Sequence, residues 1–472
     1  MNAENVNVWL VGAGPGNAGL LTLRGHEVLK NAEVVIYDRL AGDGVLALIP
    51  ENALKIDAGK IAGEHKLTQD EIIRQIIFHA QNNKRVVRLK GGDPFLFGRG
   101  AEEAEALLTN NIPFEIVPGV SSAVAVPEIA GIPATHRDFN SGVSIFTAHD
   151  KNNLVPDFNN QNAIFLMGAS RVKDVAKKLL TEKNFSPSTP CAIIQNGTTA
   201  NQKILRADLK TLYNEDFKAE IQSPAIIFVG KTANLNLTCK QILSGKRIFI
   251  TRPQGRAEKL SKLLRDNGAE VIECPTIKTE VIHGALNNFD LGGYDYIAFT
   301  SVTGVRAFFE LLRESERDIR EIGNAKIAAI GSATEDELKN FGLKVDLVPE
   351  IYDGKHLAEE LTGLVLLVRA LDVSDDMKKI LDGRGISFNT VHVYKTSYVK
   401  FLTPGFFDII IFTSASTVRG FAENTNEFRN STAVCIGEQT AIEARNAGFY
   451  DIKIAKRADI NSIFETVLSV VD

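Results

Sequence analysis

The chain has 472 residues, a length that predicts three or four domains of ordinary size. Hydrophobic residues make up 44% and charged residues 24%, the balance of a soluble globular protein, and no run of 18 apolar residues predicts a membrane span. A net charge of −5 argues against a dedicated nucleic-acid-binding protein.

Strand-like apolar runs alternate with helical patterns, which predicts α/β layers with largely parallel sheets. Residues 6–12 already form the first such run, so we expect no signal peptide. The four cysteines form no CxxC pair and no HExxH motif occurs, so we expect a cytoplasmic protein without a metal site. Further strands are expected at 33–38, 85–93, 247–253 and 408–414.

A glycine loop, Gly12-Ala13-Gly14-Pro15-Gly16, follows the first strand. It is similar to a dinucleotide-binding loop, with Asp38 at the end of the next strand as the ribose ligand. The third glycine, however, comes one residue early, and Pro15 lacks the N–H that a pyrophosphate seeks. The spacing therefore argues against NAD, and a plain tight turn stays open as an alternative.

A second loop, Gly91-Gly92-Asp93-Pro94, also follows a strand. Paired glycines let a backbone approach a ligand closely, and Asp93 can accept hydrogen bonds from an amine or a hydroxyl. The segment 95–97 (Phe-Leu-Phe) adds an apolar wall, and Arg99 precedes an acidic helical segment. This combination favours a ligand-binding bend over a purely structural turn.

These loops belong to a longer series of motifs. VWLVGAGPGNAGLLTLRG, VVRLKGGDPFLFGRGAEE, VPGVSSAVAVPEIAGIPATHRD, FLMG and NGTT occur in order within residues 6–236. The series resembles the tetrapyrrole methylase family, specifically the uroporphyrinogen-III C-methyltransferases. The resemblance implies a two-lobed methylase fold for residues 1–244, usually a homodimer, with S-adenosylmethionine as methyl donor. The cofactor contacts it implies are Pro15, Gly91, Gly92, Asp93, Leu96, Ser121, Ser122, Met167 and Gly197.

Alternatives remain for some of these residues, because Met167 also fits a strand core and Ser121-Ser122 a helix cap. By the same resemblance, Asp38 is the proton acceptor and Lys60 the proton donor. The substrate carries eight carboxylates, so cations should line its site. The candidates are Arg24, Arg39, Lys60, Arg99 and Arg137, with Arg39 and Arg99 preferred. The chain departs from the family pattern at Asn17, usually Asp, and at Ile61, usually Arg.

A break near Ser244-Gly245 separates the second half, which contains an internal repeat. YDYIAFTSVTGVRAF (294–308) matches FDIIIFTSASTVRGF (407–421), and KIAAIGSATEDELKNFGLK (326–344) matches TAVCIGEQTAIEARNAGFY (432–450). Two similar Rossmann-like lobes are therefore expected, enclosing a small-molecule site.

Residues 245–472 resemble the uroporphyrinogen-III synthases through ITRP, FTSVTGV, AIGSAT, VYKT, FTSAST and CIGEQTA. The resemblance implies a lobe of residues 246–278 and 397–472, a second lobe of 284–390, and two extended joining segments, 276–283 and 391–398. Hydroxyls at helix starts offer seats for carboxylates, or are plain N-caps. The candidates are Thr300, Ser301, Thr413, Ser414 and Thr440, which is expected to cap its helix, while Tyr394 is the candidate for assisting loss of the substrate hydroxyl.

Together these patterns predict a bifunctional enzyme of the siroheme and cobalamin branch. The C-terminal half would close hydroxymethylbilane to uroporphyrinogen III without a cofactor, and the N-terminal half would methylate it twice to precorrin-2. A methyltransferase with an inactive ligand-binding C-terminal module is the main alternative, and an oxidoreductase is a more distant one.

Overall fold

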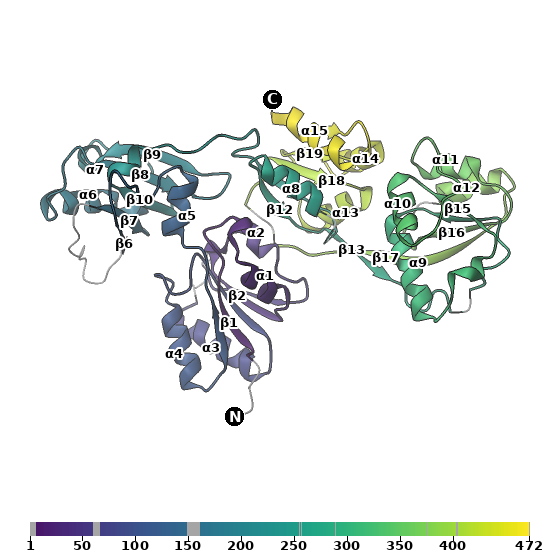
Figure 1. Cartoon of the computed structure of the whole chain (residues 1–472), viewed down its shortest axis with the longest axis horizontal. Coiled ribbons are helices and arrows are strands. Elements are labelled where there is room, and N and C mark those ends of the chain that lie inside the picture. Colours follow the sequence, from purple (N-terminus) through teal and green to yellow (C-terminus); the bar gives the residue numbers. More distant parts are fainter. Residues whose placement is uncertain are drawn as a thin grey trace. The chain divides into compact units, whose positions relative to one another are not determined.

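The chain folds around four five-stranded sheets in a computed structural model that describes residues 6–59, 67–148, 161–253, 255, 257–287, 289–373, 375–402 and 405–471. Two compact units result: Met1–Pro275 with Lys400–Asp472, and Thr276–Val399 (Figure 1). Within the described ranges, no helix is long and apolar enough to cross a membrane.

The first sheet is wholly parallel, with strand order β3-β2-β4-β1-β5. Its central strands are buried on both faces, as expected for a parallel sheet covered by helices. One apolar cluster packs α1 against the sheet, and another packs α3 and α4 against its other face (Figure 1). The elements are β1 (Val8–Gly12), η1 (Ala18–Leu20), α1 (Leu23–Lys30), β2 (Val34–Tyr37), η2 (Arg39–Ala41), α2 (Asp43–Leu46), β3 (Leu54–Asp57), α3 (Gln69–Gln81), β4 (Val86–Lys90), α4 (Gly100–Thr109) and β5 (Phe114–Val117).

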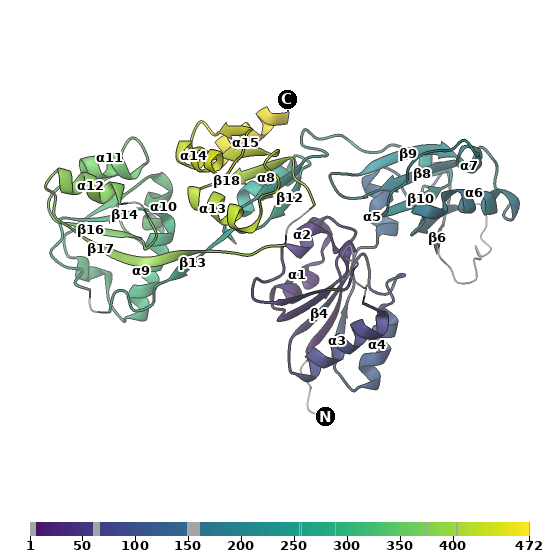
Figure 2. The ribbon, with the colours of Figure 1, turned by 180° about the vertical axis from the view of Figure 1, so that it is seen from behind.

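The second sheet, β6-β7-β10-β8-β9, departs from the expected parallel arrangement. Only β6 and β7 pair in parallel, and the other three pairings are antiparallel. A short turn joins β8 to β9, and a connection that short can link only antiparallel strands. Helix α5 packs on one face and α6 and α7 on the other (Figure 2). The elements are α5 (Ser122–Ile129), β6 (Val143–Thr147), β7 (Asn162–Leu166), η3 (Ala169–Arg171), α6 (Val172–Thr181), β8 (Pro190–Gln195), β9 (Lys203–Asp208), α7 (Leu209–Tyr213), β10 (Ala225–Val229) and η4 (Lys231–Asn234).

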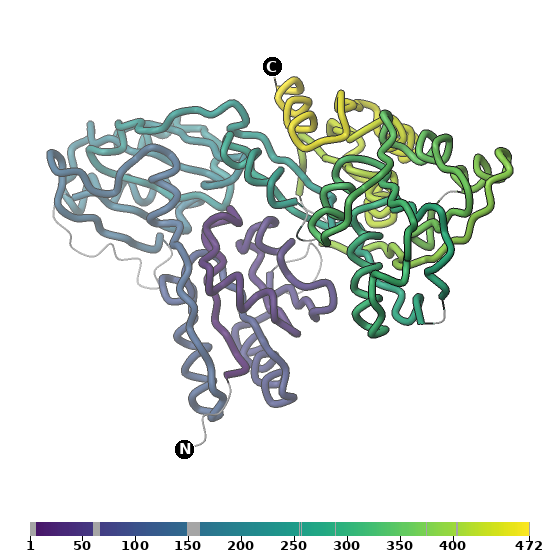
Figure 3. Tube along the Cα trace, turned by 45° about the vertical axis from the view of Figure 1, so that its right-hand side comes forward, coloured from purple at the N-terminus to yellow at the C-terminus, as the bar shows by residue number. Residues whose placement is uncertain are grey.

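The third sheet, β12-β11-β18-β19-β20, is parallel and built from two distant stretches of the chain. Strand β11 pairs directly with β18, so the segment that ends near residue 275 and the one that resumes near 400 lie side by side (Figure 3). The elements are β11 (Arg247–Ile250), α8 (Glu258–Asp266), β12 (Glu270–Glu273), β18 (Ile409–Phe412), α13 (Ala415–Asn424), β19 (Thr432–Cys435), α14 (Glu438–Asn446), β20 (Ile452–Ile454) and α15 (Ile460–Val471).

The fourth sheet, β13-β17-β16-β14-β15, forms the second unit. The segments expected to join the lobes run mostly in β13 and β17, which pair antiparallel from Ile277↔Tyr398 to Val281↔Tyr394. The elements are β13 (Ile277–Val281), β14 (Tyr296–Phe299), α9 (Val302–Glu314), η5 (Ile319–Ile322), β15 (Lys326–Ala329), α10 (Ser332–Asn340), α11 (Gly354–Glu360), β16 (Val365–Ala370), α12 (Asp376–Gly383) and β17 (Phe388–Tyr398).

The third and fourth sheets confirm the internal repeat. The strand–helix series β14-α9-β15-α10 corresponds to β18-α13-β19-α14. The strand orders correspond as well, because β17-β16-β14-β15 follows the same path as β12-β11-β18-β19. The repeated sequence therefore folds twice into the same α/β core.

An ion pair links the third sheet to helix α2 within the first unit. The side chain of Arg247, 7% exposed, places its Nη2 2.8 Å from Asp43 Oδ2 and 3.2 Å from Glu270 Oε1. Glu270 Oε2 in turn accepts a hydrogen bond from the backbone N–H of Ala200. The two compact units do not divide at residue 244, and the domain boundary there stays a prediction from the sequence.

Candidate functional site

Three loops meet at the carboxyl edge of the first sheet, because β4, β1 and β5 are neighbouring parallel strands. Gly14 and Gly92 exchange two backbone hydrogen bonds, of 3.1 and 2.7 Å. A Cβ on Gly12 would lie 2.5 Å from the Cα of Gly119 and 2.6 Å from the carbonyl oxygen of Gly92, so only glycine fits. The chain leaves β1 toward β2 and leaves β4 toward β5 on the other side of β1. This is the switch point where open α/β sheets bind ligands.

The carboxylate of Asp93 holds the second glycine loop in shape. Its Oδ1 accepts hydrogen bonds from the backbone N–H groups of Phe95 (2.9 Å) and Leu96 (3.1 Å). Its Oδ2 accepts one from Gly119 (3.1 Å), in the loop after β5. Asp93 therefore fixes the path of residues 91–96, and its direct contact with a ligand stays a prediction.

Helix α5 brings together several of the predicted cofactor residues. Ser121 caps the helix by accepting a hydrogen bond from the Ala123 N–H, and the Cβ direction of Gly92 points toward the backbone N of Ser122, 3.9 Å away. Leu96 packs against the apolar cluster that contains Val126 of this helix. A Cβ on Gly197 would meet the same Val126 side chain at 2.3 Å. Loops that follow strands of both sheets in the N-terminal half thus contribute residues beside α5.

Pro15 and Met167 differ in their surroundings. The carbonyl oxygen of Pro15 accepts a hydrogen bond from Thr198 Oγ1 (3.3 Å), which links the first glycine loop to the segment containing Gly197. Met167 follows the last residue of β7, has φ +56°, and is 47% exposed. Met167 is therefore not part of a strand core.

The departure at Asn17 has a local explanation. Its Oδ1 accepts a hydrogen bond from the Gly19 N–H (2.8 Å) and caps η1. An aspartate oxygen would accept the same bond, so the turn does not depend on the charge.

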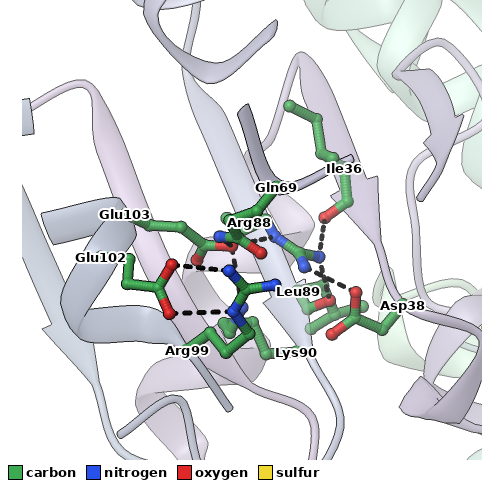
Figure 4. Close-up of polar contacts among 9 residues, drawn as sticks. All are labelled: Ile36, Asp38, Gln69, Arg88, Leu89, Lys90, Arg99, Glu102 and Glu103. Atoms are coloured by element: carbon green, nitrogen blue, oxygen red, sulfur yellow. Dashed lines mark hydrogen bonds and ion pairs between the residues drawn. The ribbon is translucent and has the colours of Figure 1, made fainter. Parts of the chain in front are cut away.

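Asp38 lies at the end of β2 and belongs to a network of buried charges (Figure 4). Arg88 Nη2 lies 2.6 Å from Asp38 Oδ1, and Arg88 Nε donates to Glu103 Oε1 at 3.0 Å. Lys90 Nζ donates to the same Glu103 oxygen at 2.8 Å, and Gln69 Nε2 at 3.1 Å. The side chains of Arg88 and Lys90 are 2% exposed and that of Glu103 is fully buried, whereas that of Asp38 is 33% exposed. Asp38 is therefore the accessible end of a buried ionic network.

The two cations of this network differ in their electrostatics. Burial disfavours the charge on Arg88, but Asp38 and Glu103 outweigh it and raise the pKa of the guanidinium. Burial lowers the pKa of Lys90, and the positive charge of Arg88 lowers it further, against the attraction of Glu103. Arg88, Lys90 and Glu103 were not among the residues predicted from the sequence. The available signal was a pair of cations two residues apart in an otherwise apolar strand, where a central parallel strand is normally apolar throughout.

The cations predicted to bind substrate carboxylates differ in whether an acidic side chain already pairs with them. Arg24 pairs with Glu115 (2.6 Å) and Glu27 (3.0 Å), and Arg99 forms a two-pronged pair with Glu102 (2.9 and 2.7 Å). Arg39 and Arg137 are exposed. Lys60 and Ile61 lie outside the described residues.

In the second unit, two predicted residues are hydrogen-bonded to each other. Ser301 caps α9 by accepting from the Gly304 N–H (2.9 Å), and its hydroxyl lies 3.0 Å from the Tyr394 hydroxyl. Thr300 Oγ1 donates to the Val368 carbonyl at 3.4 Å. Tyr394 is 8% exposed. Its hydroxyl therefore lies at the first turn of α9, among groups that can bind an anion.

In the third sheet the equivalent helix start is built similarly, with one correction. Ser414, which follows Thr413, caps α13 by accepting from the Thr417 N–H (3.3 Å). Thr440 was expected to cap α14, and this is wrong: Gly437 occupies the N-cap position, and Thr440 lies inside the first turn, 4% exposed. The helix begins at Glu438, before Thr440, so the Thr440 side chain is buried in the first turn and does not cap it. Among the residues in the described ranges, no group of three or more His, Cys, Asp or Glu is arranged to hold a metal ion.

Comparisons with known proteins divide the chain in two. The family described as Tetrapyrrole (Corrin/Porphyrin) Methylases matches residues 7–213, and the family described as Uroporphyrinogen-III synthase HemD matches residues 258–465. The porphyrin biosynthesis protein HemD of Ruminiclostridium josui is 40% identical over 502 residues, covering 99% of this chain and 98% of that protein. The uroporphyrinogen-III C-methyltransferase of Bacillus subtilis (strain 168) is 36% identical over 364 residues, covering 74% of each. Among solved structures, the Thermus thermophilus uroporphyrin-III C-methyl transferase complexed with S-adenyl homocysteine is 36% identical, with a TM-score of 0.42, covering 48% of this chain and 93% of that one.

Proposed function

We propose that this chain, which belongs to the tetrapyrrole methylases through its N-terminal half and to the uroporphyrinogen-III synthases through its C-terminal half, catalyses two consecutive reactions. The first closes hydroxymethylbilane to uroporphyrinogen III. The second methylates that ring twice to give precorrin-2. The observation that carries the proposal is the match of one relative along nearly the whole chain. In addition, the methylase family matches the N-terminal half and the synthase family matches the C-terminal half. The product of the C-terminal half is then the substrate of the N-terminal half.

The methyl donor in this proposal is S-adenosylmethionine, as in the family. The residues at the carboxyl edge of the first sheet fit such a group. Gly92, with φ +68°, allows close backbone approach beside the first turn of α5, where N–H groups favour a carboxylate. Leu96 offers an apolar contact, and Pro15, Ser121, Ser122, Met167 and Gly197 complete the proposed set. When bound, the cofactor supplies a methyl group on a sulfonium centre to an electron-rich pyrrole carbon.

The chain's own contribution to methylation is orientation and proton handling. In our proposal the Asp38 carboxylate accepts the proton that the methylated macrocycle must lose. Arg88 holds one of its oxygens at 2.6 Å, which leaves the other oxygen for the substrate. Lys60 is the proposed proton donor. Arg39 and Arg99 are the proposed partners of substrate carboxylates, although Arg99 must share its guanidinium with Glu102.

For the synthase reaction, we assign binding to hydroxyls at helix starts and the chemistry chiefly to substrate shape. Ser301, Ser414, Thr300 and Thr413 lie at the starts of α9 and α13, where N–H groups and hydroxyls suit carboxylates. Thr440, buried inside α14, is a weaker candidate. Tyr394 donates to the hydroxyl that the bilane loses, and ring closure follows with inversion of the last ring. The reaction needs no cofactor in this scheme.

Two further expectations belong with this proposal. Homodimerisation through the methyltransferase half is expected from the family alone. A cytoplasmic location is supported by four cysteines that are all free thiols.

The test supplies purified full-length protein with hydroxymethylbilane, with and without S-adenosylmethionine, and separates the products. We expect uroporphyrinogen III alone without the donor, and a dimethylated product with it. Only the non-enzymatic ring isomer in both reactions would refute the synthase half and favour an inactive ligand-binding module. Added uroporphyrinogen III that stays unmethylated would refute the methyltransferase half.

A further inference from the structure

The buried charges behind Asp38 need an explanation that packing alone does not provide. Arg88 and Lys90 project from β4 toward Glu103 of α4 (Figure 4), on the face of the sheet that also carries an apolar cluster. Burying each charge carries a large desolvation penalty, and well-packed apolar residues at such positions are often as stable or more so. A parallel strand in the centre of a sheet is normally apolar. The network is therefore better explained by what it does to its solvent-accessible charged member, Asp38.

The geometry gives each part of the Arg88 guanidinium a separate partner. Its Nε donates to Glu103, and its Nη1 donates to the carbonyls of Ile36 (3.3 Å) and Leu89 (3.2 Å). Its Nη2 donates to Asp38 at 2.6 Å. A planar guanidinium held at two of its nitrogens has one remaining direction for the third. The position of the Asp38 carboxylate thus follows from how the rest of Arg88 is anchored.

Glu103 is the charged anchor of that guanidinium. It projects from α4, and its Oε1 accepts from Arg88, Lys90 and Gln69 together. It is the anion that balances the two cations at full burial, because Asp38 lies at the partly exposed end. Without its charge, the repulsion between Arg88 and Lys90 would be uncompensated in a dry site, and the guanidinium would leave its present position.

We propose that Glu103 is a positioning residue for methyl transfer, which fixes the Arg88 guanidinium and through it the orientation of the Asp38 carboxylate. This inference rests on the proposed methyltransferase function and on the proton-accepting role of Asp38 within it. Glu103 itself is fully buried, so in this proposal it acts through Arg88 and not on the substrate or the cofactor.

A double-mutant cycle in the full-length protein tests the inference. The variants are Glu103→Gln, Asp38→Asn and the double variant, with Glu105→Gln, an exposed glutamate on the same helix, as matched control. Methylation of uroporphyrinogen III is followed in single turnovers, so that slow variants still give a rate. Calorimetric titration with S-adenosylhomocysteine checks that the cofactor site is intact.

We expect Glu103→Gln to lower the methylation rate about 10- to 100-fold, since a misplacement of about 1 Å has effects of that order. Binding of S-adenosylhomocysteine should stay within about twofold, because none of the network side chains is among the proposed cofactor contacts. In the Asp38→Asn background, Glu103→Gln should change the rate by less than about twofold, because residues that act as a unit are not additive. Glu105→Gln should behave as the unchanged protein.

Equal effects of Glu103→Gln with and without Asp38 would overturn the inference, since they would indicate a general structural role. An unchanged rate in Glu103→Gln would overturn it too. If Glu103→Gln does not fold, Glu103→Asp keeps the charge but withdraws it by one methylene, and its loss of rate must show the same dependence on Asp38. An unmodified protein that forms no methylated product would refute the proposed function itself, a separate and recognisable result.

Discussion

Replacing Gly12 by alanine tests whether the meeting of the three loops forms the cofactor site. The added Cβ would lie 2.5 Å from the Cα and 2.6 Å from the N of Gly119, and 2.6 Å from the carbonyl oxygen of Gly92. All three contacts are backbone atoms, so no side chain can rotate away. The loops must separate by about 0.9 Å to restore an ordinary 3.4 Å contact. Overpacking of this kind destabilises a fold by about 1–3 kcal/mol.

The substitution should also affect cofactor binding, beyond its effect on the stability of the fold. A shift of this size in the 91–93 loop should weaken binding of S-adenosylhomocysteine about 10- to 100-fold in calorimetric titrations. Synthase turnover by the same protein should be unchanged and serves as an internal control. The matched variant is Gly383→Ala, in an exposed helix end with nothing within 4 Å of the added carbon, which should be neutral or stabilise by roughly 0.5–1 kcal/mol. Unchanged affinity in a folded Gly12→Ala protein would refute this placement of the cofactor site.

Two further substitutions test other parts of the structure. Tyr394→Phe removes the hydroxyl that lies 3.0 Å from Ser301, which should reduce the free energy of unfolding by about 1 kcal/mol and strongly slow ring closure, while methylation of added uroporphyrinogen III continues; normal ring closure would argue against the proposed role. Arg24→Gln removes the guanidinium whose hydrogen bond, more than that of Trp9, lowers the pKa of Glu115. The Arg24–Glu115 interaction should stabilise the folded protein above about pH 4.3, the ordinary pKa of glutamate. This contribution to the free energy of unfolding should be lost as the pH falls through the lower pKa of Glu115 in the folded protein. The melting temperatures of variant and unmodified protein should therefore differ at pH 7 and converge in acid, with Trp9, the single tryptophan and itself bonded to Glu115, as the fluorescent reporter; a difference that persists in acid would contradict this assignment.

The sequence determined the two halves, the α/β class and the internal repeat. Each rests on local patterns: alternating apolar runs, glycine loops after strands, and paired segments such as 294–308 and 407–421. The structure confirms the repeat as two sheets with corresponding strand orders. Motifs also made Asp38 and the loop at residues 91–93 candidates for the site, because glycines and charges at strand ends are recognisable in a sequence.

Only the tertiary structure decided which distant groups meet. The antiparallel second sheet depends on pairing partners, which apolar runs do not specify. The cap of α14 depends on where the helix starts, and a shift of three positions moved Thr440 from the cap into a buried turn. The contact of Glu103 with Arg88 and Lys90 depends on a helix crossing the sheet at one place. Because these charges are buried, each is stable only when its partners are in place. No local pattern in the sequence predicts which residues pair.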